Sequence, residues 1–240
     1  MNKLYRRSEL LFALAWIILY VVGTSVMDGL SEGMGVRSAL TLPFHAALCA
    51  GAYLWMRGNG LLRKYGLCAP RVSGKKMLFY LPLALAASCN LWTGFHMDRP
   101  LHEALLFAGS MLCVGFIEEV IFRGFLFVAM RKDGLKSAVA VSALTFGIGH
   151  IVNLLNGAPL LPTLCQVVYA AAFGLTAVVI FLKTDSILPC ILAHSALNAL
   201  SVFAPEAQTD TQTILISLLL TLINGAYVLY LVRRAARAKE

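Results

Sequence analysis

The sequence has few charged residues: Asp, Glu, Lys and Arg make up 13% of its 240 residues, whereas hydrophobic residues make up 59%. An average soluble domain carries about 25% charged residues. No polar block is long enough to fold outside a bilayer, and no internal repeat, low-complexity segment or Pro/Gly-rich linker divides the chain. The composition therefore excludes a set of linked soluble domains and predicts one polytopic membrane domain over residues 1–240.

The six cysteines are scattered, without a C-x-x-C pair or the spacing of metal ligands. This pattern excludes a disulfide framework and a cysteine metal site. Acidic residues are also scarce, 12 against 20 Lys and Arg, which gives a formal net charge of +8. Because the basic residues lie between apolar runs and form no patch, the charge indicates orientation in a bilayer and excludes nucleic acid as a partner.

Apolar runs of about 20 residues, the length that crosses a bilayer as a helix, fill most of the chain. They predict an all-α integral membrane protein with about eight transmembrane helices. The fifth and seventh runs are short, so these two spans are the least well defined. The eight runs lie near residues 9–27, 38–56, 77–95, 104–130, 137–152, 164–182, 187–204 and 212–232.

The basic residues divide unevenly between the two sides of this layout. If the N-terminus is inside, the inner segments hold all but three of the 20 Lys and Arg residues. The exceptions are Arg37 and Arg99 in outer segments and Arg123 within the fourth run. Since Lys and Arg collect on the cytoplasmic side, we expect an even number of spans, both termini in the cytoplasm and a location in the inner (cytoplasmic) membrane.

Three charged residues lie inside the fourth run, where each costs roughly 2.5–3.5 kcal/mol and marks a candidate functional site. Glu119 and Arg123 are four residues apart with the acid first, the better orientation for an ion pair on one helix face. Glu118 points about 100° away from Glu119 and has no partner on its own helix. It is therefore a candidate general base, whereas the ion pair could serve only to fix helix packing.

Two other runs carry polar groups at a similar depth. His150 ends the fifth run, and His194 shares one helix face of the seventh run with Asn198. Glu118, His150 and His194 each lie ~15–20 Å from the inner end of their run at 1.5 Å per residue. Their common depth predicts one polar site at the centre of helices 4, 5 and 7. A single membrane histidine is often only an interhelical hydrogen-bond partner, the interpretation that we give to His45.

Other hydrolytic sites fit the sequence poorly. It has no G-x-S-x-G elbow for a serine nucleophile and no paired membrane aspartates of the Y-D and G-x-G-D kind. His102 and Glu103 begin like the zinc motif H-E-x-x-H, but position 106 is Leu. These observations exclude the corresponding serine, aspartyl and zinc proteases.

Three motifs occur in order, each in an apolar run: E-E-x-x-x-R (Glu118, Glu119, Arg123), F-x-x-x-H (Phe146, His150) and H-x-x-x-N (His194, Asn198). This set resembles the CPBP intramembrane protease family, which includes the CAAX prenyl endopeptidases and bacteriocin-processing or immunity-associated (Abi-type) proteins. The resemblance covers the motif-bearing core, residues 104–204. It implies an eight-helix fold with a conical cavity that opens toward the cytosol.

The resemblance also implies a role for each motif residue. Glu118 would activate the attacking water, which His150 would hold, and His194 with Asn198 would stabilise the developing oxyanion. Glu119 and Arg123 would orient Glu118 and support it electrostatically. The expected function is an intramembrane endopeptidase that hydrolyses a peptide bond of a membrane-associated protein or peptide precursor.

Alternatives exist for both the cofactor and the function. Glu118, His150 and His194 would offer Zn²⁺ three ligands and an open position, but a water held by Glu118 and His150 needs no metal, so we favour a site without a cofactor. A non-catalytic membrane scaffold or immunity factor is one alternative function. A proton-coupled transporter is another, because Glu and His chains also relay protons. The expected partners are the lipid bilayer and a peptide or membrane-protein substrate.

Overall fold

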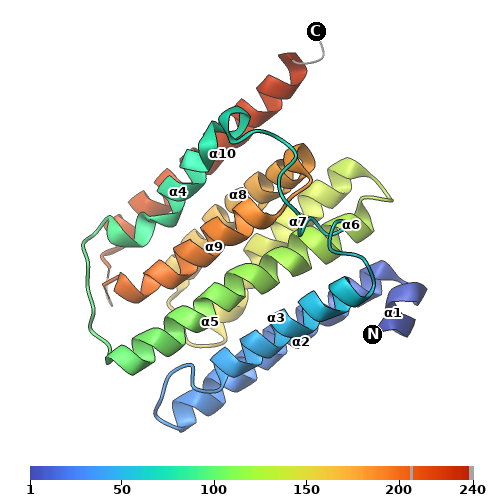
Figure 1. The fold of residues 1–240 in the computed structure, drawn as a ribbon. Coiled ribbons are helices and arrows are strands. Elements are labelled where there is room, and N and C mark those ends of the chain that lie inside the picture. The colour runs from blue at the N-terminus through green and yellow to red at the C-terminus, as the bar shows by residue number, and fades with distance from the viewer. Residues whose placement is uncertain (206–207, 238–240) are drawn as a thin grey trace.

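The computed structural model describes residues 1–205 and 208–237, which form helices and no strand (Figure 1). The all-α prediction is thus confirmed for this part of the chain. The helices are α1 (Asn2–Arg7), α2 (Glu9–Gly33), α3 (Thr41–Gly58), α4 (Leu81–Ala87), α5 (Leu101–Glu119), α6 (Phe127–Met130), α7 (Leu135–Gly149), α8 (Leu160–Thr184), α9 (Leu188–Leu200) and α10 (Asp210–Arg237).

The helices form a bundle of two layers. One layer contains α3, α5, α9 and α4, each packed on the next, and the other contains α2, α7, α8 and α10. At the edges, α2 packs on α3 and α10 packs on α4. The turn η3 (Val120–Leu126), which continues α5, contacts both α2 and α7. The end of α5 therefore lies between the two layers.

Five helices in the described residues are long and apolar enough to cross a membrane, which makes the chain a membrane protein. Leu188–Phe203, which covers α9 and a 3₁₀ turn, is apolar but shorter. The count of eight transmembrane helices therefore stays a prediction. The five candidate spans are Glu9–Gly33, Leu101–Met130, Leu135–Leu154, Leu160–Thr184 and Asp210–Arg234.

The third predicted span, near residues 77–95, is broken in the structure. Gly74–Tyr80 form a 3₁₀ segment with positive φ at three consecutive residues, and Pro82 follows in the first turn of α4. Proline suits a helix start because the first N–H groups have no intrahelical acceptor. Only seven α-helical residues remain in α4, followed by a 3₁₀ turn.

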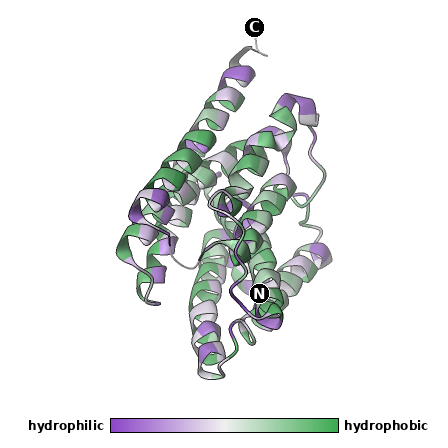
Figure 2. Ribbon diagram, turned by 90° about the vertical axis from the view of Figure 1, so that its left-hand side faces the viewer, coloured by the Kyte–Doolittle hydropathy of each residue, from purple (hydrophilic) through white to green (hydrophobic). Residues whose placement is uncertain are grey.

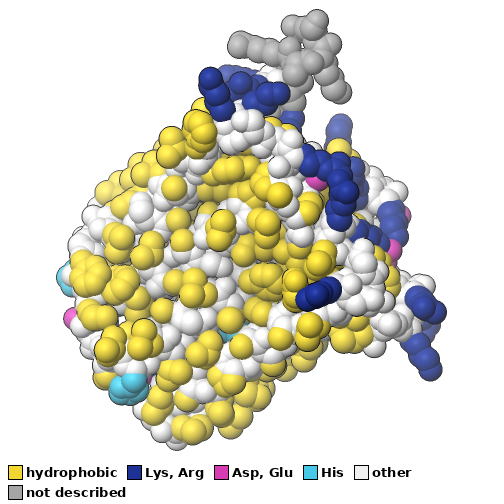
Figure 3. Space-filling model, viewed as in Figure 1, with side chains coloured by type: hydrophobic (Ala, Val, Ile, Leu, Met, Phe, Trp, Pro, Cys, Tyr) yellow, Lys and Arg dark blue, Asp and Glu magenta, His cyan; other side chains and the backbone are white. Residues whose placement is uncertain are grey.

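The two ends of the bundle differ in charge. Hydrophobic residues predominate along the helices and polar residues collect at their ends (Figure 2). Lys and Arg gather where both termini lie, at the upper right of Figure 3. Two lysines, Lys64 and Lys132, bind the Glu9 carboxylate there at 2.8 and 2.9 Å. We call this the basic end, at which α2 begins and α3, α6 and α8 end; the opposite end is the distal end.

Candidate active site

Both glutamates and the arginine of the first motif lie in one continuous helix, Leu101–Met130. Glu118 and Glu119 end α5, and Arg123 lies within η3, which is a π-helical turn. Such turns are rare, and they occur frequently at functional sites. Ser142 of α7 donates a 2.9 Å hydrogen bond to the Phe122 carbonyl in this turn. The serine therefore holds the turn in place, consistent with the exclusion of a serine nucleophile.

The predicted ion pair is present and fully buried. Glu119 Oε1 lies 3.1 Å from Arg123 Nη1, and both residues are 0% exposed. The guanidinium carbon lies 4.0 Å from the ring centroid of Phe146 and 5.7 Å from that of Phe173. The two rings add cation–π attraction to the pair in an apolar environment.

His194 of α9 lies between the two glutamates. Its Nδ1 is 3.0 Å from Glu119 Oε1, and its Nε2 is 3.4 Å from Glu118 Oε2. Because a carboxylate only accepts, Nδ1 carries the hydrogen that binds Glu119. The imidazole therefore connects the buried ion pair to Glu118, a link that helical spacing in the sequence does not reveal.

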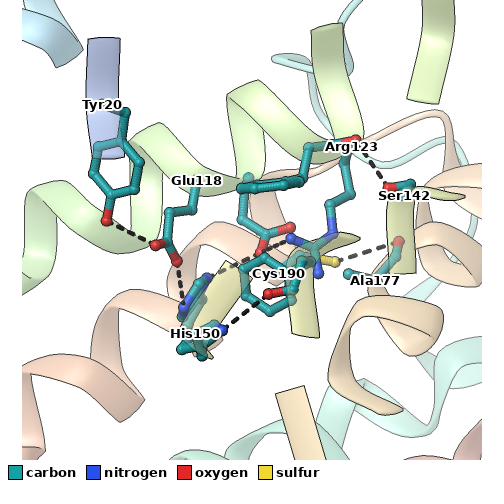
Figure 4. A network of polar contacts seen from close by, with 11 residues as sticks. Tyr20, Glu118, Arg123, Ser142, His150, Ala177 and Cys190 are labelled. Atoms are coloured by element: carbon teal, nitrogen blue, oxygen red, sulfur yellow. Dashed lines mark hydrogen bonds and ion pairs between the residues drawn. The ribbon is translucent and has the colours of Figure 1, made fainter. Parts of the chain in front are cut away.

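Tyr20 of α2 is a site residue that sequence reasoning missed. Its hydroxyl donates a 2.7 Å hydrogen bond to Glu118 Oε1, and Figure 4 shows the two side chains pointing toward each other. The partners are 98 residues apart in the chain, and Tyr20 sits in an ordinary apolar run. No sequence signal could have paired them.

Replacing Tyr20 by Phe is expected to lower kcat about tenfold with little change in KM. The change removes a buried hydrogen bond to a carboxylate, worth about 1.5–3 kcal/mol, and a loss of 1.36 kcal/mol in the transition state is tenfold in rate. Steady-state cleavage kinetics measure it, with Tyr53→Phe as the matched control because Tyr53 is 39% exposed. Equal kcat for both variants would show that Tyr20 does not position Glu118.

His150 lies just after α7, at the start of a 3₁₀ turn. Its Nδ1 lies 2.9 Å from the Phe146 carbonyl, so Nδ1 carries the hydrogen and Nε2 of the neutral ring is an acceptor. The Phe146 carbonyl thus fixes the tautomer of His150, and the Phe146 ring packs against the Arg123 guanidinium.

A cavity of about 280 Å³ adjoins these groups. Glu118, His150 and Asn198 line it, whereas the buried ion pair does not. A smaller pocket of about 30 Å³ beside it is lined by His150, His194 and Asn198, a volume that suits about one water molecule. The structure therefore gathers the six candidate site residues. Glu118, His150 and Asn198 line the cavity, His194 lines the pocket beside it, and the pair Glu119–Arg123 lies behind them.

The cavity extends from Glu118 toward the distal end of the bundle. There it is lined by Asp28 near the end of α2 and by Asn156 in the α7–α8 connection. The family resemblance implies a cavity open to the cytosol, whereas the distribution of basic residues predicts that the other end faces the cytoplasm. These two expectations disagree for this chain, because the cavity lies toward the end opposite to the basic residues.

A close approach of α5 and α9 brings His194 to the glutamates. A Cβ added at Gly115 would lie 2.4 Å from the backbone nitrogen of Ser195. Ser195 also donates a 2.9 Å hydrogen bond to the Leu112 carbonyl. Small residues allow this backbone contact between membrane helices, and it sets the distance from Glu118 to His194.

Replacing Gly115 by Ala is expected to destabilise the protein by about 1–3 kcal/mol, the cost of overpacking, and to reduce activity by separating α5 from α9. Unfolding in detergent and cleavage rates measure both effects. Gly51→Ala in α3 is the control, since an added Cβ there meets no atom within 4 Å. Two variants of equal stability and activity would contradict the importance of this contact.

The residues that could hold zinc do not form a ligand set as they stand. No group of three or more His, Cys, Asp or Glu side chains able to bind a metal is found among the described residues. Both nitrogens of His194 face carboxylates, and His150 Nδ1 faces a carbonyl. These contacts leave neither nitrogen of His194 free to bind a metal.

Residues 99–200 match the family described as type II CAAX prenyl endopeptidase Rce1-like. This segment contains all three motifs, so the match confirms the resemblance found from them. The family is one of proteases, and residues 99–200 are similar to it. Helices α2, α3, α4 and α10 lie outside it. No match was found among curated proteins or solved structures.

Proposed function

We propose that the chain is an intramembrane endopeptidase in which Glu118 acts as the general base. The observation that carries this proposal is the contrast between the two glutamates. Glu119 is paired with Arg123 and 0% exposed, whereas Glu118 lines a cavity and is held by Tyr20 and His194. One carboxylate is neutralised and the other faces the space where a substrate and water can enter.

The charges of the cluster favour one shared proton. Glu119 and Arg123 cancel each other, and the remaining pair of Glu118 and His194 has no net charge only when it holds one proton in addition to the hydrogen on His194 Nδ1. A buried site of low polarity disfavours an unbalanced charge. Glu118 and His194 can therefore exchange this proton across their 3.4 Å contact as the reaction proceeds.

The chemical steps follow from these positions. Glu118 takes a proton from a water held against His150 Nε2, and the water oxygen attacks the carbonyl carbon of the scissile peptide bond. Asn198 and protonated His194 donate hydrogen bonds to the oxyanion of the tetrahedral intermediate. The proton then passes to the leaving nitrogen, the C–N bond breaks, and a new carboxyl group and a new amine are released.

The ion pair serves the reaction indirectly. Glu119 orients the His194 ring through its 3.0 Å hydrogen bond, and Arg123 lies 3.1 Å from Glu119 and balances its charge. A preorganised cluster of this kind needs little rearrangement when charge develops. These two residues position the reacting groups and do not contact the substrate.

The location proposed for this activity is the inner (cytoplasmic) membrane, with both termini in the cytoplasm. The uneven distribution of Lys and Arg supports this orientation. The substrate proposed is a peptide or membrane-protein precursor, since the cavity adjoins apolar helices that face the bilayer.

A reconstitution assay tests the proposal. Purified protein in liposomes is incubated with detergent-extracted membrane proteins from cells that lack it, and newly formed peptide N-termini are identified by mass spectrometry. The proposal expects a defined set of cleavages. Liposomes that cleave nothing but move protons or solute would instead support the transporter, and inactivity in both assays would support the scaffold.

A further inference from the structure

Five aromatic side chains lie between the site and the basic end. Phe125 is at their centre, with its ring centroid 5.0–5.9 Å from those of Phe12, Trp16, Trp55 and Tyr65. Phe125 follows Glu118 toward the basic end of the long helix, and Trp16 precedes Tyr20 toward the same end of α2. Four of the five rings are buried. This packed aromatic seal, mostly edge to face, closes the site toward the basic end.

Toward the distal end the site is open. A second hollow of about 360 Å³ shares Ser25, Asp28 and Asn156 with the site cavity. We call this hollow the vestibule. Glu32 and Arg37 also line it, and they are exposed, as is Asn156. A continuous polar path thus leads from the surface at the distal end, through the vestibule, to Glu118.

The path offers the groups that recognise a peptide backbone. Asn153, Asn156, Gln166 and Asn198 line the cavity, and each primary amide both donates and accepts hydrogen bonds. Asn153 donates a 2.9 Å hydrogen bond to Gln166 Oε1, which leaves the Asn153 oxygen and the Gln166 amino group to face a substrate. An extended peptide presents N–H and C=O groups that satisfy such amides. A hydrocarbon chain would offer these amides no hydrogen bond in place of the water that it displaces, which costs free energy.

We infer that the site takes an extended, unmodified polypeptide segment presented on the non-cytoplasmic face of the membrane. The cleavage of this segment rests on the proposed function. The direction from which it enters rests on the geometry of the cavity and the aromatic seal. The basic end is held in the cytoplasm by its Lys and Arg residues, and the aromatic seal closes that side. The substrate segment is therefore one that has already crossed the membrane.

Side-specific labelling of introduced cysteines tests the direction of entry without requiring cleavage. The full chain carries Asn156→Cys in the vestibule or, as the matched control, Arg131→Cys at the basic end. A membrane-impermeant maleimide is added to intact cells or to inverted membrane vesicles. Mass spectrometry reads the labelled peptide at each position, so the six native cysteines stay in place and the wild-type chain gives the background.

The inference expects Asn156→Cys to react at least tenfold faster in intact cells than in inverted vesicles, and Arg131→Cys to show the reverse. The opposite pattern, or equal labelling from both sides, would overturn it. In a second measurement, the same reagent on Ser25→Cys in intact cells should block cleavage of an identified substrate. If labelled Ser25→Cys still cleaves at the unlabelled rate, the inferred direction of entry is wrong. If the wild-type chain cleaves no substrate, the proposed function is wrong, but the labelling of Asn156→Cys and Arg131→Cys still tests the direction of entry.

Discussion

Replacing Glu118 by Gln is expected to lower the rate of substrate cleavage by about 10²–10⁴-fold, the contribution of a positioned general base. Gln has nearly the same size and can still accept the hydrogen bond from Tyr20, so the packing at the site persists. It cannot take a proton from water. The rate constant kcat of purified wild-type and variant protein in liposomes, on one substrate and at matched protein amounts, measures the effect.

Two further variants define what the loss means. Glu103→Gln, in the first turn of the same helix, should leave kcat within about twofold, because Glu103 lies far from the cavity. Glu118→Asp keeps the carboxylate but shortens the side chain by one methylene. It should retain part of kcat, because a misplaced base is less effective but can still take a proton. Wild-type kcat in Glu118→Gln would assign the base to another residue.

Replacing Arg123 by Met is expected to destabilise the protein by about 3–5 kcal/mol, because breaking a buried ion pair leaves an uncompensated charge. Glu119 is 0% exposed, and Phe146, whose ring lies against Arg123, cannot replace the lost cation. Among the residues that the structure describes, His194 would remain as its ionisable partner in contact. Chemical unfolding in detergent, followed by intrinsic fluorescence, measures the loss.

The double variant Glu119→Gln with Arg123→Met should recover most of that stability, since it removes both charges together. Arg131→Met serves as the control, because Arg131 is exposed at the end of the same helix, and it should change stability by less than about 0.5 kcal/mol. A double variant no more stable than Arg123→Met would mean that the arginine acts through contacts other than Glu119.

The sequence predicted the helical class because it depends on long apolar runs, which are visible in composition. The break at Gly74–Tyr80 was not predicted, since residues 77–87 are apolar and hydropathy carries no information on φ. The runs expected to be weakest were the fifth and seventh. The seventh, Leu188–Phe203, is indeed a shorter apolar helix, whereas the fifth, as Leu135–Leu154, is long and apolar enough to cross.

In the candidate site, too, some contacts could be predicted from the sequence and others could not. The Glu119–Arg123 pair follows from helical spacing, and the common depth of Glu118 and His194 follows from counting residues along two helices. Both were therefore predictable. Contacts that depend on side-by-side packing were not. His194 reaches both glutamates only because Gly115 lets α5 approach α9, and Tyr20 meets Glu118 from a helix far away in the chain.

The direction of the cavity shows where motif resemblance reached its limit. The motifs specify which residues surround Glu118, and the structure brings them together. They carry no information on which end of the bundle is closed. The closure depends on rings such as Trp16 and Trp55, which lie outside the matched segment. The side of the membrane that the closed end faces depends on the distribution of Lys and Arg.

The most direct measurement of the central claim is the set of new protein N-termini in membranes of cells that produce wild-type protein or Glu118→Gln at equal levels. If Glu118 is the base of an intramembrane endopeptidase, a defined group of N-termini will be present with the wild-type protein and absent with the variant. Identical sets of N-termini from the two proteins would contradict the account.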